Sequence, residues 1–118
     1  MVLAGGATGS LARYLLTLAA NSHFGDRFPF GTMSINIVGS FLIGLLLVTF
    51  DRRELLHPNL RPLVITGLLG GFTTFSAFEW ETLSLGRTSA PLAILYCVSS
   101  VAAGLLACWL GVALARRI

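Results

Sequence analysis

The chain has 118 residues, which is room for one domain, because domains commonly have about 100 to 150 residues. Hydrophobic residues make up 55% and charged residues 11%, against about 25% charged residues in an ordinary soluble domain. The mean hydropathy is +0.83, and the formal net charge of +3 rests on scattered arginines rather than on a basic patch. This composition excludes a water-soluble globule, a disordered chain and a nucleic-acid-binding protein.

Four long segments have the apolarity of membrane-spanning helices, which need about 20 residues each. The first is the least apolar because Arg13 interrupts it. Short connections make consecutive helices antiparallel neighbours, and no basic residue precedes Arg13, so a cleaved secretory signal is not expected. The sequence therefore predicts an all-α protein of the lipid bilayer, with both termini on one side and a single four-helix domain over 1–118. The expected helices are 2–20, 30–50, 62–84 and 91–115.

The arginines near the helix ends indicate how such a bundle is oriented. Arg27 and Arg87 lie at the ends away from the termini. The positive-inside rule favours cytoplasmic termini, because more arginines lie on the terminal side. These are Arg52, Arg53, Arg61, Arg116 and Arg117.

The third segment contains adjacent glycines followed by adjacent threonines, in the string Gly70-Gly71-Phe72-Thr73-Thr74. Glycine costs about 1 kcal/mol relative to alanine in a helix, and threonine hydroxyls compete for backbone partners. The pattern predicts that the third helix is broken near its middle, where freed backbone groups can bind an ion. Close packing of helices through small residues explains the glycines equally well.

Aromatic and hydroxyl side chains recur at helical spacing after this string. Phe75 and Phe78 are three residues apart and share one helix face. Ring edges are partially positive and can contact a dehydrated anion, although core packing is the commoner role of such a pair. Tyr96 and Ser100 in the fourth segment repeat the spacing of four residues and form a possible hydroxyl track.

The second segment carries Thr32, Asn36 and Ser40 in one stripe. The Asn36 amide must face protein or water, as an anion ligand or in an interhelical hydrogen bond. The charge of Arg13 must extend to the membrane–water interface, pair with another group or line a cavity. Glu81 lies near the end of the third segment, where it can sit in a vestibule, carry a proton or mark the membrane boundary. No enzyme motif is present, and we predict a protein that is not an enzyme.

Three motifs in the first three segments resemble those of the fluoride channel family called Fluc or CrcB. They are Gly5-Gly6-x-x-Gly9-x-x-x-Arg13-Tyr14, Gly31-Thr32-x-x-x-Asn36-x-x-Gly39-Ser40-Phe41-x-x-Gly44 and Gly67-x-x-Gly70-Gly71-Phe72-Thr73-Thr74-Phe75-Ser76-x-Phe78. The resemblance covers about two thirds of the chain, and the third motif is highly specific.

The resemblance implies an antiparallel, dual-topology homodimer that exports fluoride passively through two pores across the bacterial cytoplasmic (inner) membrane. It implies a central structural sodium ion on the backbone carbonyls of Gly70 and Thr73. It also implies that the fluoride pathway includes Asn36, Phe75, Phe78, Ser76, Thr74, Tyr96, Ser100, Arg13 and Glu81.

Two features depart from the family pattern. Gly104 stands where some members carry another hydroxyl on the fourth helix, so the outer part of that track differs. The arginine bias is larger than a chain that inserts both ways requires, so a heterodimer with an oppositely biased paralogue is the alternative to the homodimer.

Three other functions compete with a channel. A small multidrug-type cation exporter needs a carboxylate in its first helix, where this chain has Arg13 instead. A proton-coupled fluoride antiporter would use Glu81 as its proton carrier. A structural membrane subunit would use the polar stripes only to hold helices together.

Overall fold

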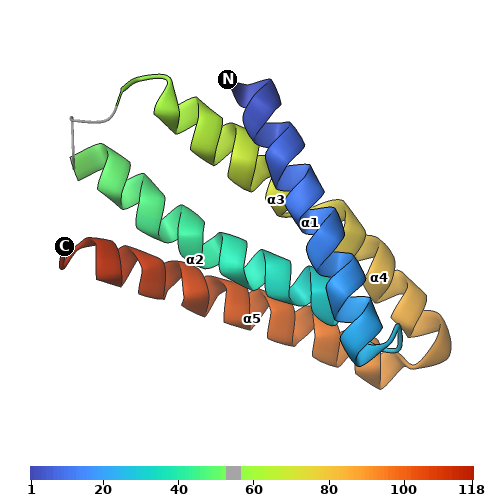
Figure 1. The fold of residues 1–118 in the computed structure, drawn as a ribbon. Helices are drawn as coiled ribbons and strands as arrows, with labels where there is room; N and C mark the ends of the chain where they lie inside the picture. Colours follow the sequence, from blue (N-terminus) through green and yellow to red (C-terminus); the bar gives the residue numbers. More distant parts are fainter. Residues whose placement is uncertain (53–56) are drawn as a thin grey trace.

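The computed structural model describes residues 1–52 and 57–118, and in these two ranges the secondary structure is helical (Figure 1). The helices are α1 (Val2–Phe24), α2 (Phe30–Arg52), η1 (Pro62–Leu69), α3 (Gly70–Phe72), α4 (Phe75–Thr88) and α5 (Ala90–Ala115). Because η1, α3 and α4 follow one another along one path, they are treated together as the third rod, and the chain forms about four such rods. The expected all-helical membrane protein is confirmed at this level.

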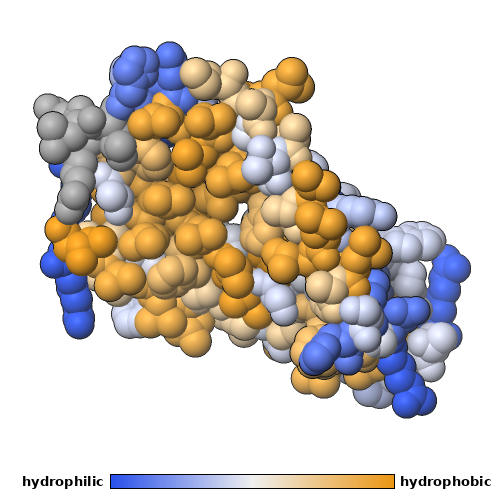
Figure 2. All heavy atoms as spheres, in the orientation of Figure 1, coloured by the Kyte–Doolittle hydropathy of each residue, from blue (hydrophilic) through white to orange (hydrophobic). Residues whose placement is uncertain are grey.

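Among the described residues, three helices are long and apolar enough to cross a membrane. They are Phe30–Arg52, Pro62–Thr88 and Ala90–Ala115, with mean hydropathies of 2.1, 1.2 and 2.0. Helix α1 has 23 residues but is not one of the three, because Arg13 lowers its hydropathy. Figure 2 shows the corresponding surface, with apolar atoms over the middle of the molecule and polar atoms gathered towards its two ends.

Glycines let the helices approach one another backbone to backbone. Helix α1 packs on η1 where Gly9 faces the Leu68 carbonyl, and a Cβ added to Gly9 would overlap that oxygen. Helices α2 and α5 lie side by side (Figure 1) where a Cβ on Gly111 would overlap the Phe41 carbonyl oxygen. Close packing through small residues is how helices associate in lipid, where burial of apolar surface drives little association.

The third rod changes its backbone geometry twice. Its first part, η1, is an eight-residue π-helix that begins at Pro62, and its continuation α3 ends at Phe72. Thr73 (φ −81°, ψ 158°) and Thr74 (φ −153°, ψ 119°) are extended. Helix α4 then starts again, with the Thr74 hydroxyl accepting a hydrogen bond from the Ala77 N–H at 3.3 Å.

Both termini lie at the same end of the molecule (Figure 1). There the Arg52 guanidinium donates to the Arg116 carbonyl at 2.9 Å, and Arg61 forms a salt bridge with Asp51 at 2.8 Å. Arg53, which contributes to the arginine bias, lies outside the described residues. The orientation of the bundle in the membrane therefore stays a prediction.

Candidate functional site

The extended residues Thr73 and Thr74 interrupt the third rod between α3 and α4. At this interruption, Asn36 on α2 binds both the N–H and the carbonyl of Thr74. Its amide nitrogen donates to the Thr74 carbonyl at 2.9 Å, and its amide oxygen accepts from the Thr74 N–H at 2.9 Å. The amide oxygen thus replaces the partner that a continuous helix would give the Thr74 N–H, and the amide nitrogen adds a donor to the carbonyl of this N-cap residue of α4. One of the two amide hydrogens of Asn36 is left for another partner.

The interruption also releases carbonyl groups from their helical partners. In a continuous α-helix the Thr74 N–H would bond to the Gly70 carbonyl and the Ala77 N–H to the Thr73 carbonyl. Those donors go instead to Asn36 and to the Thr74 hydroxyl. The Gly70 and Thr73 carbonyls are therefore left without these partners, as oxygen ligands suited to a hard cation.

A third carbonyl at the interruption is occupied by an arginine. Arg13 on α1 donates its Nε–H to the Gly71 carbonyl at 3.1 Å. The guanidinium of Arg13 is therefore bound to the backbone of the third rod. Arg13 is half-buried, and it lines neither of the two pockets described below.

A groove of about 490 Å³ lies beside the interruption, between α2, the third rod and α5. It brings together most of the residues expected from the sequence. Its wall is predominantly apolar, and it includes Asn36, Gly70, Thr73, Thr74, Phe75, Phe78 and Ser100. The groove also includes Ser40 and Gly104, which lies one turn beyond Ser100 on α5.

The Ser100 hydroxyl is the clearest free donor in this groove. Within the described parts of the chain, its Oγ is a buried polar atom that has no hydrogen-bond partner. A buried hydroxyl without a partner costs about 1 to 3 kcal/mol. The groove thus contains an unused donor that a bound anion or water would satisfy.

The two phenylalanines differ in exposure although they share a helix face. Phe78 is 8% exposed, whereas Phe75 is 69% exposed. Their ring centroids are 5.7 Å apart and the ring planes are inclined by 37°. Phe75 thus presents most of its ring outside the fold of this chain, while Phe78 forms part of the interior beside Tyr96.

Glu81 accepts hydrogen bonds from two buried hydroxyls. Thr32 donates to its Oε1 and Tyr96 donates to its Oε2, both at 2.7 Å. Tyr96 is fully buried, at 0% exposure. Since a phenol has one proton to donate, Tyr96 can offer that proton to an anion only after its bond to Glu81 opens.

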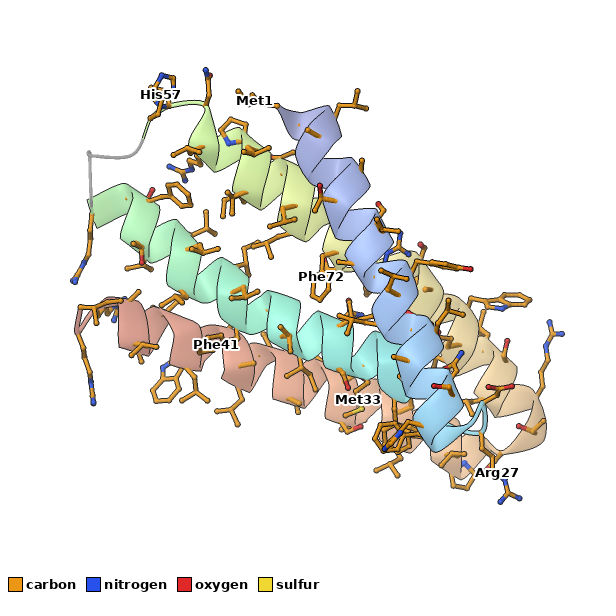
Figure 3. The ribbon with its side chains drawn as sticks, in the orientation of Figure 1. Met1, Arg27, Met33, Phe41, His57 and Phe72 are labelled. Carbon is orange, nitrogen blue, oxygen red and sulfur yellow. The ribbon has the colours of Figure 1, made fainter. Side chains whose placement is uncertain are left out.

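Glu81 also lines a second pocket, of about 430 Å³, at the end of the molecule away from the termini. The α1–α2 connection supplies one wall of this pocket, and the last turns of α4 supply the other. The lining residues are Asp26, Arg27, Pro29, Glu81, Ser84, Leu85 and Thr88. Figure 3 places Arg27 at this end, opposite Met1 and His57. The pocket therefore holds charges of both signs.

Three expected residues line neither pocket, namely Arg13, Ser76 and Tyr96. Ser76 is exposed, and its hydroxyl lies 3.5 Å from the Thr74 hydroxyl. Sequence reasoning also missed contributors. Thr32 appeared only as part of a stripe, and its pairing with Glu81 joins residues 49 positions apart. Phe28, whose ring contacts Tyr96, lies in a loop where no periodic pattern could identify it.

The two kinds of group at the interruption favour two kinds of ligand. The groove offers hydroxyl and amide donors and few charges, which suits a small anion that must exchange its water for other donors. The released carbonyls offer acceptors only. Within the described residues, no group of three or more His, Cys, Asp or Glu side chains could hold a metal ion.

Three helices that are long and apolar enough to cross a membrane, with a groove beside an interrupted helix, are the features of a small multi-pass membrane protein. The profile of the family described as "CrcB-like protein, Camphor Resistance (CrcB)" matches residues 1–112, and the chain belongs to this family. The resemblance drawn from the three sequence motifs is thereby confirmed.

Relatives match over nearly their whole length. A protein of Solibacter usitatus named "Fluoride-specific ion channel FluC" is 46% identical over 118 residues, which cover 99% of this chain and 97% of that protein. A protein of the same name from Magnetococcus marinus is also 46% identical, with 99% and 96% covered. Another from Agrobacterium fabrum is 42% identical, with 100% and 95% covered.

Proposed function

We propose that this chain forms a passive, fluoride-selective ion channel of the bacterial cytoplasmic membrane. The relatives described above are named for this activity, and they are ion channels by name rather than enzymes. The observation in the fold that carries the proposal is the groove at the interrupted helix. It combines an apolar wall with the unpartnered hydroxyl of Ser100 and the spare amide hydrogen of Asn36.

In this proposal the groove is part of the fluoride pathway. Fluoride is small and strongly hydrated, so a narrow pathway must replace its water with several donors. Ser100, Thr74 and Asn36 offer such donors, and the edges of the Phe75 and Phe78 rings add partially positive hydrogens. Ser76 extends the hydroxyl series, Tyr96 donates to Glu81 at one entrance, and Arg13 supports the interruption with its positive charge.

The proposal includes an antiparallel dimer, with α1 as its fourth membrane span, that encloses two pathways. Two observations support a second copy. Phe75 is largely exposed in the single chain. The groove between α2, the third rod and α5 is open rather than enclosed. The arginine distribution leaves a homodimer and a heterodimer with an oppositely biased paralogue as the two forms, and the mass of purified protein in detergent distinguishes either from a monomer.

A central structural sodium ion is the remaining part of the proposal. The Gly70 and Thr73 carbonyls fit it, because both have lost their helical donors and neutral oxygens suit a hard cation. Two oxygens are few for such an ion, and the same pair from a second copy would double the set. The ion would supply a fixed positive charge between the copies. Replacement of sodium by N-methylglucamine during purification should lower the thermal stability of the dimer.

The decisive experiment measures fluoride release from liposomes that contain the purified protein and are loaded with potassium fluoride. A fluoride electrode follows the release after addition of the potassium ionophore valinomycin, and liposomes loaded with chloride serve as the control. Rapid, valinomycin-dependent release of fluoride alone is the expected result. No release from well-folded protein, or equal release of chloride, would refute the proposal.

The same assay tests the second candidate, a proton-coupled antiporter in which Glu81, a half-buried carboxylate that lines the second pocket, would carry the proton. An antiporter would exchange fluoride for protons, so its fluoride release would be accompanied by proton uptake and would respond to a pH gradient. A channel releases fluoride with no coupled proton movement and needs no pH gradient. A multidrug-type exporter would transport an organic cation, and fluoride release would exclude it.

Phe75→Ile is expected to lower fluoride flux about tenfold, because the ring edge that contacts the ion is lost while the apolar volume is largely kept. Phe24→Ile is the matched control. That residue is similarly exposed, at 62% against 69% for Phe75, but lies outside the groove. Wild-type flux in Phe75→Ile, or equal losses in the two variants, would remove Phe75 from the pathway.

A further inference from the structure

A series of aromatic rings connects the surface of the α1–α2 connection with the interior of the groove. Successive ring centroids lie between 4.6 and 5.7 Å apart. The series runs through His23, Phe24, Phe30, Phe28, Tyr96, Phe78 and Phe75. Phe28 is the member that joins the loop between the helices to the buried Tyr96.

Phe28 contacts Tyr96 in a perpendicular arrangement. Their centroids are 5.4 Å apart and their planes are inclined by 86°. Phe78 contacts Tyr96 as well, with the centroids 5.3 Å apart. The rings of Phe28 and Phe78 thus restrict the position of the Tyr96 ring, and the hydrogen bond to Glu81 restricts its hydroxyl.

The sequence neighbours of Phe28 line the second pocket, whereas Phe28 itself does not. Asp26, Arg27 and Pro29 line the 430 Å³ pocket together with Glu81, whereas the half-buried Phe28 contacts Tyr96. Glu81 therefore faces the pocket on one side and receives the Tyr96 hydroxyl on another. The position of this carboxylate depends on Tyr96, and the position of Tyr96 depends on Phe28.

We propose that Phe28 is a positioning residue for ion entry. It holds the Tyr96 ring so that its hydroxyl stays on Glu81, and this bond keeps the carboxylate charge compensated at the pocket. Without the Phe28 ring, Tyr96 gains rotational freedom and its hydroxyl leaves Glu81 for part of the time. A carboxylate with one partner fewer repels an arriving anion more strongly. This inference rests on the proposed function, because its transport readout is fluoride flux.

The transport test is a double-mutant cycle between Phe28→Leu and Tyr96→Phe. Phe28→Leu is expected to lower flux about 3- to 10-fold, the range of one perpendicular ring contact. In the Tyr96→Phe background, Phe28→Leu should lower the flux no further, because the hydroxyl through which it acts is absent. Phe28→Tyr keeps the ring and should restore at least half of the wild-type flux. Phe24→Leu removes a ring of the series that does not contact Tyr96 and should leave the flux unchanged.

A second readout separates the failure of this inference from the failure of the proposed function. The chain has two tyrosines, so fluorine NMR of protein labelled with 3-fluorotyrosine resolves Tyr96 once Tyr14→Phe assigns the other signal. Phe28→Leu should shift and broaden the Tyr96 signal, and Phe24→Leu should not. If Phe28→Leu does not fold, Phe28→Met serves in both experiments.

The two readouts give clear contrary outcomes. An unchanged Tyr96 signal in the Phe28 variant would overturn the inference whether or not the protein transports fluoride. An equal fold-loss of flux in the wild-type and Tyr96→Phe backgrounds would also overturn it, because Phe28 would then act through the loop alone. Absence of flux in the wild-type protein would instead refute the channel function.

Discussion

Asn36→Asp is expected to reduce fluoride flux by about 100-fold or more. The amide now donates to the Thr74 carbonyl and accepts from its N–H, and an ionised carboxylate keeps only the accepting role. The Thr74 carbonyl would lose this side-chain donor and face a negative charge. The same charge would lie in the groove, where two unit charges 4 Å apart repel by about 4 kcal/mol at an effective dielectric constant of about 20.

Flux from liposomes measures this loss, and Asn59→Asp is the matched control. Asn59 is exposed and precedes η1, where its carbonyl accepts the Leu63 N–H at 3.4 Å. The control changes the net charge equally and should retain the flux. Wild-type flux in Asn36→Asp would show that the Asn36 side chain lies off the ion pathway and that the interruption tolerates its loss.

Gly9→Ala is expected to destabilise the protein by about 3 kcal/mol or more. The added methyl group would overlap the Leu68 carbonyl oxygen and lie 2.9 Å from the Phe72 nitrogen. Overpacking costs about 1 to 3 kcal/mol when side chains can yield. Here the neighbours are backbone atoms of η1 and α3, so α1 itself must move away. That movement would also separate Arg13 from the Gly71 carbonyl.

Thermal unfolding in detergent, followed by circular dichroism or by loss of the monodisperse peak on size exclusion, measures this effect. Gly6→Ala on the same helix is the control, because its Cβ would meet only the Gly67 carbonyl oxygen, at 4.0 Å. It should be neutral or slightly stabilising, since alanine favours the helix by up to about 1 kcal/mol. Equal stability of the two variants would contradict the described packing of α1.

Hydropathy carries most of what the sequence indicates about the fold. Long apolar runs are sufficient to predict helices, because a chain in lipid must satisfy its backbone internally. The ends of the helices are set by local chemistry instead. Helix α1 continues past residue 20 to Phe24 and ends at Gly25, which has a φ of 75°. Helix α4 continues to Thr88, next to Ser89, whose hydroxyl accepts from the Leu92 N–H at 3.4 Å and caps α5.

For the candidate site, the sequence predicts features that depend on one helix but not contacts between helices. Spacing alone indicates that Asn36 faces a neighbour and that Phe75 and Phe78 share a face, because both conclusions depend on one helix. Spacing cannot reveal that Asn36 binds the backbone of Thr74, 38 residues away. Nor can it pair Tyr96 with Glu81, since that contact depends on how α4 and α5 pack.

The interrupted third rod has a consequence for how the molecule is assembled. The groups that bind its released backbone, the Asn36 amide and the Arg13 guanidinium, come from α2 and α1. Both helices are synthesised before the third rod, so its hydrogen-bond partners are already present when it enters the membrane. On its own, this segment would satisfy its backbone best as a continuous helix. We therefore expect the extended conformation of Thr73 and Thr74 to form when this segment docks against α1 and α2, so that any step that delays these helices delays it too.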